Sequence, residues 1–107
     1  MNKKVLISGY GSIGRRHTKI LSKVVKNKNI TILSKQKISK FFNIKNIKML
    51  NEIDPDYIVI CNPTADHLSK IKFIEKNCKN KIVLVEKPLF SKPNGIKIKN
   101  NKYYVGY

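Results

Sequence analysis

The sequence predicts an α/β fold, a doubly wound parallel sheet formed by a single domain. Short apolar segments alternate along the chain with segments in which apolar residues recur at helical spacing. The clearest strand, residues 57–61, is apolar without alternation, which is typical of a parallel strand covered on both faces. A length of 107 residues suits one hydrophobic core.

The first third of the chain predicts a strand, a tight turn, a helix and a second strand. Residues 4–8 form an apolar strand that runs directly into a glycine-rich turn at residues 9–14. Residues 12–25 follow with an apolar stripe of period 3.6, which predicts a helix. Residues 30–33 are apolar or β-branched and predict the second strand.

The rest of the chain continues the alternation. Aromatic and apolar residues favour a short helix at 38–42 and a short third strand at 47–50. Asp54-Pro55-Asp56 predicts a turn, because proline fixes φ and has no N–H to donate. The fourth strand, residues 57–61, follows this turn.

After the fourth strand, Thr64 can cap a helix whose apolar side extends to Cys78. Residues 82–85 predict a fifth strand and residues 103–105 a last one. Because crossovers between parallel strands are right-handed, we expect a strand order close to 3-2-1-4-5-6.

The glycine turn has the G-x-G-x-x-G form of a dinucleotide-binding site. Gly9 permits the tight turn, Gly11 removes the Cβ that would block the phosphates, and Gly14 lets helix and strand pack closely. The first N–H groups of the following helix would point at the pyrophosphate, which the helix dipole also favours. Chance glycines in an ordinary strand–turn–helix are the alternative, against which the order of the elements argues.

The residues after the second strand bear on the choice between NAD and NADP. NAD-binding domains usually place Asp or Glu here, on the ribose hydroxyls. This chain has Ser34 and Lys35 instead, so nothing repels a 2′-phosphate and a positive charge is near. The hypothesis is a preference for NADPH. NAD is the alternative, because Lys35 is one lysine among many.

The composition narrows the class of protein. The formal net charge is +17, but all basic residues except Arg15 and Arg16 are lysines scattered along the chain. Sites that read nucleic acids favour clustered arginine, so a specific nucleic-acid partner is not predicted. No apolar run approaches a membrane span, and a cytoplasmic protein is the default. Cys61 and Cys78 read as free thiols and no metal site is predicted.

Three motifs together resemble the Gfo/Idh/MocA family, the glucose-fructose oxidoreductases and inositol dehydrogenases. The resemblance covers residues 5–107 in the family's order. The motifs are Gly9-x-Gly11-x-x-Gly14-x-x-His17, Asn62-Pro63-Thr64-x-x-His67 and Glu86-Lys87-Pro88.

The resemblance implies a role for each matching position. Around the adenosine half of the cofactor, Ser34 and Lys35 would lie at the ribose. Around the nicotinamide half, Glu86 would help to seat the ring. Residues expected to line the pyrophosphate are Gly9, Gly11, Ser12, Ile13 and Gly14; those expected to border the nicotinamide half are Asn62, Pro63 and His67.

Lys87 matches the family's lysine that orients the substrate and takes part in proton transfer, and it is the predicted catalytic residue. Pro88 matches a proline that is often cis. His17 is expected to be a helix residue bonded to neighbouring backbone, whereas His67 reads equally as a packed side chain or as a ligand. One of Arg15 and Arg16 can approach the phosphates, and the other is expected to be solvated.

Family members continue into a larger α/β domain that holds the substrate and supplies an Asp/His pair. Residues 104–107 match the strand that leads towards it, so the resemblance implies only the cofactor domain, residues 1–107. The expected reaction is hydride transfer between a nicotinamide and a carbon bearing a hydroxyl, on a sugar or polyol, with little turnover from this chain alone. The alternatives are a non-catalytic dinucleotide-binding or interaction remnant and, less favoured, a basic nucleic-acid-binding or membrane-surface protein. The oligomeric state is left open.

Overall fold

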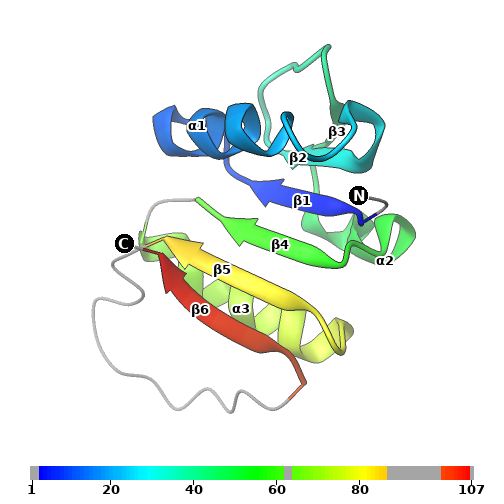
Figure 1. Cartoon of the computed structure of the whole chain (residues 1–107). Coiled ribbons are helices and arrows are strands. Elements are labelled where there is room, and N and C mark those ends of the chain that lie inside the picture. The colour runs from blue at the N-terminus through cyan, green and yellow to red at the C-terminus, as the bar shows by residue number, and fades with distance from the viewer. Residues whose placement is uncertain (1–2, 62–63, 87–99, 107) are drawn as a thin grey trace.

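The computed structural model describes residues 3–61, 64–86 and 100–106; of residues 64–68 and 105–106 only the backbone is described. The described strands are β1 (Val5–Ser8), β2 (Ile30–Leu33), β3 (Phe42–Ile44), β4 (Tyr57–Ile60), β5 (Ile82–Glu86) and β6 (Lys102–Gly106). They form one sheet in the order β3-β2-β1-β4-β5-β6, and every neighbouring pair is parallel (Figure 1). The predicted fold class and strand order are therefore confirmed. Among the described residues, no helix has the length and apolar character needed to cross a membrane.

Short helical elements connect the strands in the described part of the chain. The α-helices are α1 (Ser12–Leu21), α2 (Leu50–Ile53) and α3 (Thr64–Asn77). Two 3₁₀ turns, η1 (Asn27–Asn29) and η2 (Ile47–Met49), complete the described elements.

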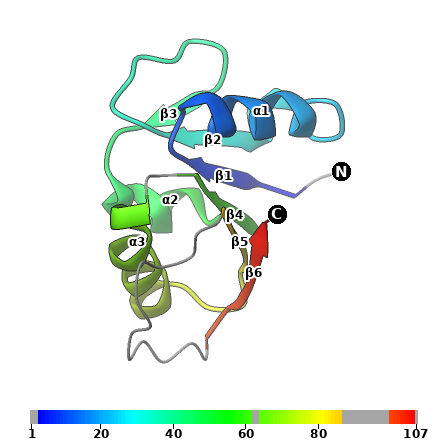
Figure 2. The ribbon, with the colours of Figure 1, turned by 90° about the vertical axis from the view of Figure 1, so that its left-hand side faces the viewer.

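The sheet separates two groups of buried side chains. Because successive residues of a strand point to opposite faces, Val5 and Ile7 of β1 pack on the side of α1, whereas Leu6 packs on the side of α2 and α3. Ile71 and Ile74 bring α3 onto that second face. Figure 2 shows α1 and the pair α2 and α3 on opposite sides of the sheet.

Two short elements were predicted wrongly. The expected helix at 38–42 is absent, and its last residue, Phe42, begins β3. Pairing decides this, because β3 adds to the edge of β2 and the Asn43 amide donates to the carbonyl of Ile32 at 3.0 Å. The expected strand at 47–50 is instead η2 followed by the start of α2. There the Asn46 side chain accepts from the backbone N–H of Lys48 at 2.9 Å, which caps a helical turn.

The first helix is also shorter than its apolar stripe predicts, because it ends at Leu21 rather than at residue 25. The N–H of Lys23 bonds to Ile20, and the N–H of Val24 bonds to Leu21, so the helix tightens into a turn. This turn returns Val25 to the core, where it is 1% exposed.

Candidate functional site

The candidate site lies at the carboxyl ends of the strands, where β1 and β4 are neighbours. From β1 the chain crosses to β2 on one side, and from β4 it crosses to β5 on the other. In open α/β sheets, this reversal leaves a crevice in which ligands bind. The glycine turn, the end of β2 and the end of β5 all open onto this edge (Figure 1).

The glycine turn is held in a form that only glycine allows at two of its positions. Gly9 has φ of 97°, and its N–H bonds to the carbonyl of Leu33 at 2.9 Å. A Cβ on Gly14 would lie 2.1 Å from the carbonyl oxygen of Gly9 and 3.7 Å from Cβ of Cys61. The start of α1 is therefore seated directly on the ends of β1 and β4.

Gly11 differs, because its surroundings are open. It is the N-cap of α1 in an extended conformation, and a Cβ placed there would meet nothing within 4 Å. Ser12 is exposed and Ile13 is 44% exposed at the first turn. The first N–H groups of a helix have no partner within it. The residues present thus fit a phosphate group approaching Gly11, with Gly9 and Gly14 shaping the turn behind it.

The end of β2 is tied to the glycine turn by Gln36. Its Nε2 donates to the carbonyl of Tyr10 at 3.2 Å, and its backbone N–H donates to Oγ of Ser34 at 3.1 Å. The Arg15 guanidinium donates to Oε1 of Gln36 at 3.4 Å and lies 5.4 Å from the centre of the Tyr10 ring. The Arg15 side chain thereby lies beside the segment that leaves β2, residues 34–36.

Tyr10 and Gln36 were missed in reading the sequence. Their backbone and amide contacts join positions 26 residues apart. The sequence predicts only that one of Arg15 and Arg16 approaches the phosphates. The position of Arg15 near the start of α1 is the signal that could have linked it to the end of β2.

The expectation that His17 bonds to neighbouring backbone is contradicted. Its Nε2 contacts Oε1 of Glu86 at the end of β5. The side chains of His17 and Glu86 are 25% and 19% exposed, so the pair is largely withdrawn from solvent. Sequence reasoning placed Glu86 in the site but not its partner, which lies 69 residues away.

Cys61 lies beside this pair at the end of β4, and its N–H bonds to the carbonyl of Ser8 at 2.8 Å. Burial, and secondarily the Glu86 carboxylate, raise the pKa of the Cys61 thiol to about 12. The thiol is therefore neutral near pH 7, which is unlike an activated nucleophile.

Three predicted site residues, Asn62, Pro63 and Lys87, lie outside the described residues, as does Pro88. His67 lies in α3, with only its backbone described. Asn62 and Pro63 follow β4 directly in the sequence, and Lys87 follows β5.

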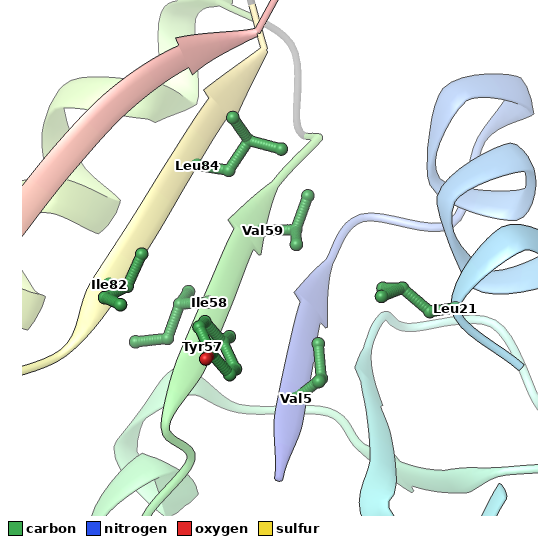
Figure 3. Close-up of a pocket in the computed structure, with 7 residues that line it drawn as sticks. All are labelled: Val5, Leu21, Tyr57, Ile58, Val59, Ile82 and Leu84. Atoms are coloured by element: carbon green, nitrogen blue, oxygen red, sulfur yellow. The ribbon is translucent and has the colours of Figure 1, made fainter. Parts of the chain in front are cut away.

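A separate apolar groove of about 220 Å³ lies on the α1 side of the sheet. Figure 3 shows Leu21 of α1 facing β1, β4 and β5 across it. The lining residues are Val5, Leu21, Tyr57, Ile58, Val59, Ile82 and Leu84. Tyr57 is the single titratable group in this lining, so the groove offers little for catalysis, and the polar site is the one at the strand ends.

Comparison with known proteins identifies the family. The sequence matches the Gfo/Idh/MocA oxidoreductase family, NAD-binding Rossmann fold, over residues 3–99. No curated protein sequence matches the chain.

Solved structures show the same fold. Pyrroline carboxylate reductase of Plasmodium falciparum, with NADP bound, has a TM-score of 0.66 and 18% identity over 78% of this chain and 33% of its own. The scyllo-inositol dehydrogenase of Lactobacillus casei has a TM-score of 0.66 and 19% identity over 84% and 30%. Dihydrodipicolinate reductase of Paenisporosarcina sp. TG-14, with dipicolinate bound, has a TM-score of 0.62 and 16% identity over 85% and 39%.

The chain thus spans about a third of the length of each of these structures. Its family match covers nearly the whole sequence. The chain belongs to the Gfo/Idh/MocA oxidoreductases and carries their NAD-binding Rossmann fold.

Proposed function

We propose that this chain is the cofactor domain of an oxidoreductase that uses NADPH in preference to NADH. The observation that carries the proposal is the glycine turn, with Gly14 pressed against Gly9 and open space beside Gly11 at the start of α1. In this arrangement the pyrophosphate would lie along the turn. The residues assigned to it are Gly9, Gly11, Ser12, Ile13 and Gly14.

The choice of cofactor rests on Ser34, Lys35 and Arg15. No carboxylate occurs at residues 34–37, and Gln36 holds the Arg15 guanidinium beside the end of β2. A guanidinium offers several N–H donors to a phosphate, and lysine adds charge. These groups would bind the 2′-phosphate, and the adenosine half of the cofactor would therefore lie beside the end of β2.

The nicotinamide half would extend towards the ends of β4 and β5. Asn62, Pro63 and His67 would border it, and Glu86 would help to seat it. When bound, the cofactor supplies or accepts the hydride. Lys87 would orient the substrate hydroxyl and take part in its proton transfer. Lysine is suited to this role when burial lowers its pKa.

We further propose a sugar or polyol as the substrate of the complete enzyme, with hydride transfer at a carbon bearing a hydroxyl. The family resemblance supports this class, and one structural neighbour is named a scyllo-inositol dehydrogenase. Residues 1–107 alone are expected to bind cofactor with little turnover, because the substrate would lack most of its binding surface.

Titration of the purified chain with NADPH and with NADH, followed by nicotinamide fluorescence, tests the cofactor assignment. We expect tighter binding of NADPH, and Arg15→Gln and Lys35→Gln should each weaken NADPH several-fold while changing NADH little. Lys79→Gln is the matched control for lost charge, because Lys79 is exposed and precedes β5, at the opposite edge of the sheet. Tighter NADH binding would refute the NADP preference, and steady turnover of a polyol panel would refute the expected inactivity.

A further inference from the structure

We infer that His17 is a positioning residue, which holds the Glu86 carboxylate in place for the nicotinamide half of the cofactor. The inference rests on the proposed function, because the placement of Glu86 matters only if a dinucleotide binds at this edge of the sheet. The inference gives His17 a role in the site. Neither the glycine turn nor the Glu86-Lys87-Pro88 motif assigns it one.

The location of His17 is set by the glycine turn. Gly14 approaches both the carbonyl of Gly9 and the side chain of Cys61, and Thr18 Oγ1 donates back to the carbonyl of Gly14 at 2.7 Å. Gly14 and Thr18 are the buried residues of α1. With that side of the helix against the sheet, His17 projects from the adjacent flank, towards β4 and β5.

The contact between His17 and Glu86 crosses from one half of the site to the other. The strand order places β4 between β1, which carries the glycine turn, and β5, which ends at Glu86. Nε2 of His17 meets Oε1 of Glu86 above this intervening strand. The phosphate end and the nicotinamide end of the crevice are thereby joined by one side-chain pair.

The Glu86 carboxylate is largely withdrawn from solvent, so a hydrogen-bond donor such as His17 stabilises it. Glu86 is 19% exposed at its side chain, and a poorly hydrated carboxylate without a hydrogen-bond donor costs free energy. The neighbouring Cys61 thiol is a weak donor. With Oε1 directed at His17, the second oxygen of the carboxylate is the acceptor that a ligand amide can use.

Paired ligands distinguish positioning from a general structural role. NADPH contains the nicotinamide, whereas 2′,5′-ADP retains only the adenosine half with its 2′-phosphate. In calorimetric titrations of the full chain, His17→Leu should weaken NADPH about 10-fold, the scale of one hydrogen bond to a charged group. Binding of 2′,5′-ADP should change less than about 2-fold. Lys19→Leu, on the exposed side of the same helix, should change neither.

Conservative variants keep the inference testable if His17→Leu fails to fold. His17→Gln retains a donor and should recover part of the NADPH affinity. Glu86→Gln should weaken NADPH similarly, and the double variant His17→Gln/Glu86→Gln should fall short of the sum of the two effects. In the protein without ligand, Glu86→Gln should shift the ring NMR signals of His17, which reports the contact directly.

The outcomes separate the two proposals. Equal loss of NADPH and 2′,5′-ADP in the His17 variants, additive effects in the double variant, or unchanged His17 signals in Glu86→Gln would each overturn the positioning role. If the wild-type chain bound neither ligand, the proposed function itself would fail, and the role in cofactor seating would fail with it.

Discussion

Single residues in the glycine turn carry different constraints, although the three glycines form one motif. Gly9 needs its positive φ, Gly14 needs the absence of a Cβ, and Gly11 needs neither within the protein itself. Gly14 is therefore required for folding, whereas Gly11 would be required only by a bound ligand.

Serine at these two positions tests the separation. Gly14→Ser places a Cβ 2.1 Å from a backbone oxygen, so we expect a loss of about 2 kcal/mol or more in the free energy of unfolding. Gly11→Ser meets no neighbour and serine is a good N-cap, so stability should change by less than about 0.5 kcal/mol. Urea denaturation measures both.

The same variants test the phosphate assignment. Gly11→Ser should leave the fold intact and yet weaken NADPH by about 10-fold or more, because its Cβ would occupy the space intended for the phosphates. Unimpaired NADPH binding by Gly11→Ser would count against the proposed position of the pyrophosphate.

At the scale of elements, Glu75 joins α3 to the start of β6. It is 8% exposed, and its carboxylate accepts from the backbone N–H of Asn100 at 3.1 Å and from the amide of Asn101 at 2.6 Å. The Tyr103 hydroxyl donates to the same carboxylate at 3.1 Å. Burial, and then the charge of Glu75, raise the pKa of Tyr103 well above its usual value. Tyr103 thus remains a neutral donor to the carboxylate.

Removal of this carboxylate should loosen β6. Glu75→Ala removes the acceptor of the buried Asn101 amide and of two part-buried donors, the Asn100 N–H and the Tyr103 hydroxyl. We therefore expect a loss of about 3 kcal/mol in the free energy of unfolding. Its neighbour Lys76 is exposed, and Lys76→Ala should cost less than about 0.5 kcal/mol. Equal effects of the two variants in thermal or urea unfolding would show that the buried network contributes nothing.

On the scale of the whole molecule, the two faces of the sheet are covered unequally within the described residues. The face that packs against α2 and α3 includes Ile58 at 1% exposure, whereas the face that carries α1 leaves Ile82 39% and Tyr104 55% exposed. Parallel sheets are normally covered on both faces. This exposed part adjoins the apolar groove of Figure 3.

Two isoleucines on the two faces provide a matched comparison. Ile58→Ala opens a cavity in the core and should cost about 2–5 kcal/mol. Ile82→Ala, on the open face, should cost about 1 kcal/mol or less, mainly through strand propensity. If Ile82→Ala proved as costly in urea denaturation as Ile58→Ala, the α1 face over β5 would have to be covered in solution.

Elements formed by local patterns can be predicted from the sequence, whereas elements decided by contacts between distant residues cannot. The glycine turn and the long apolar strand at residues 57–61 are local patterns, and with right-handed crossovers they predict the sheet and its strand order. The segments at 38–42 and 47–50 were predicted wrongly, because a few apolar residues fit a helix or a strand equally well. Pairing of β3 with β2 and the cap at Asn46 decided them.

The candidate site divides in the same way. The sequence by itself determined the fold class and the family. It also predicts that Gly9–Gly14, Ser34, Lys35 and Glu86 share one site, because strand ends of a parallel sheet share one edge. Only the tertiary structure decided that His17 meets Glu86 and that Gln36 holds Arg15 beside the end of β2. These partners are 69 residues apart for His17 and Glu86 and 21 residues apart for Arg15 and Gln36. Both contacts depend on the rotation of α1 about its own axis, which is set by the packing of Gly14 against Gly9.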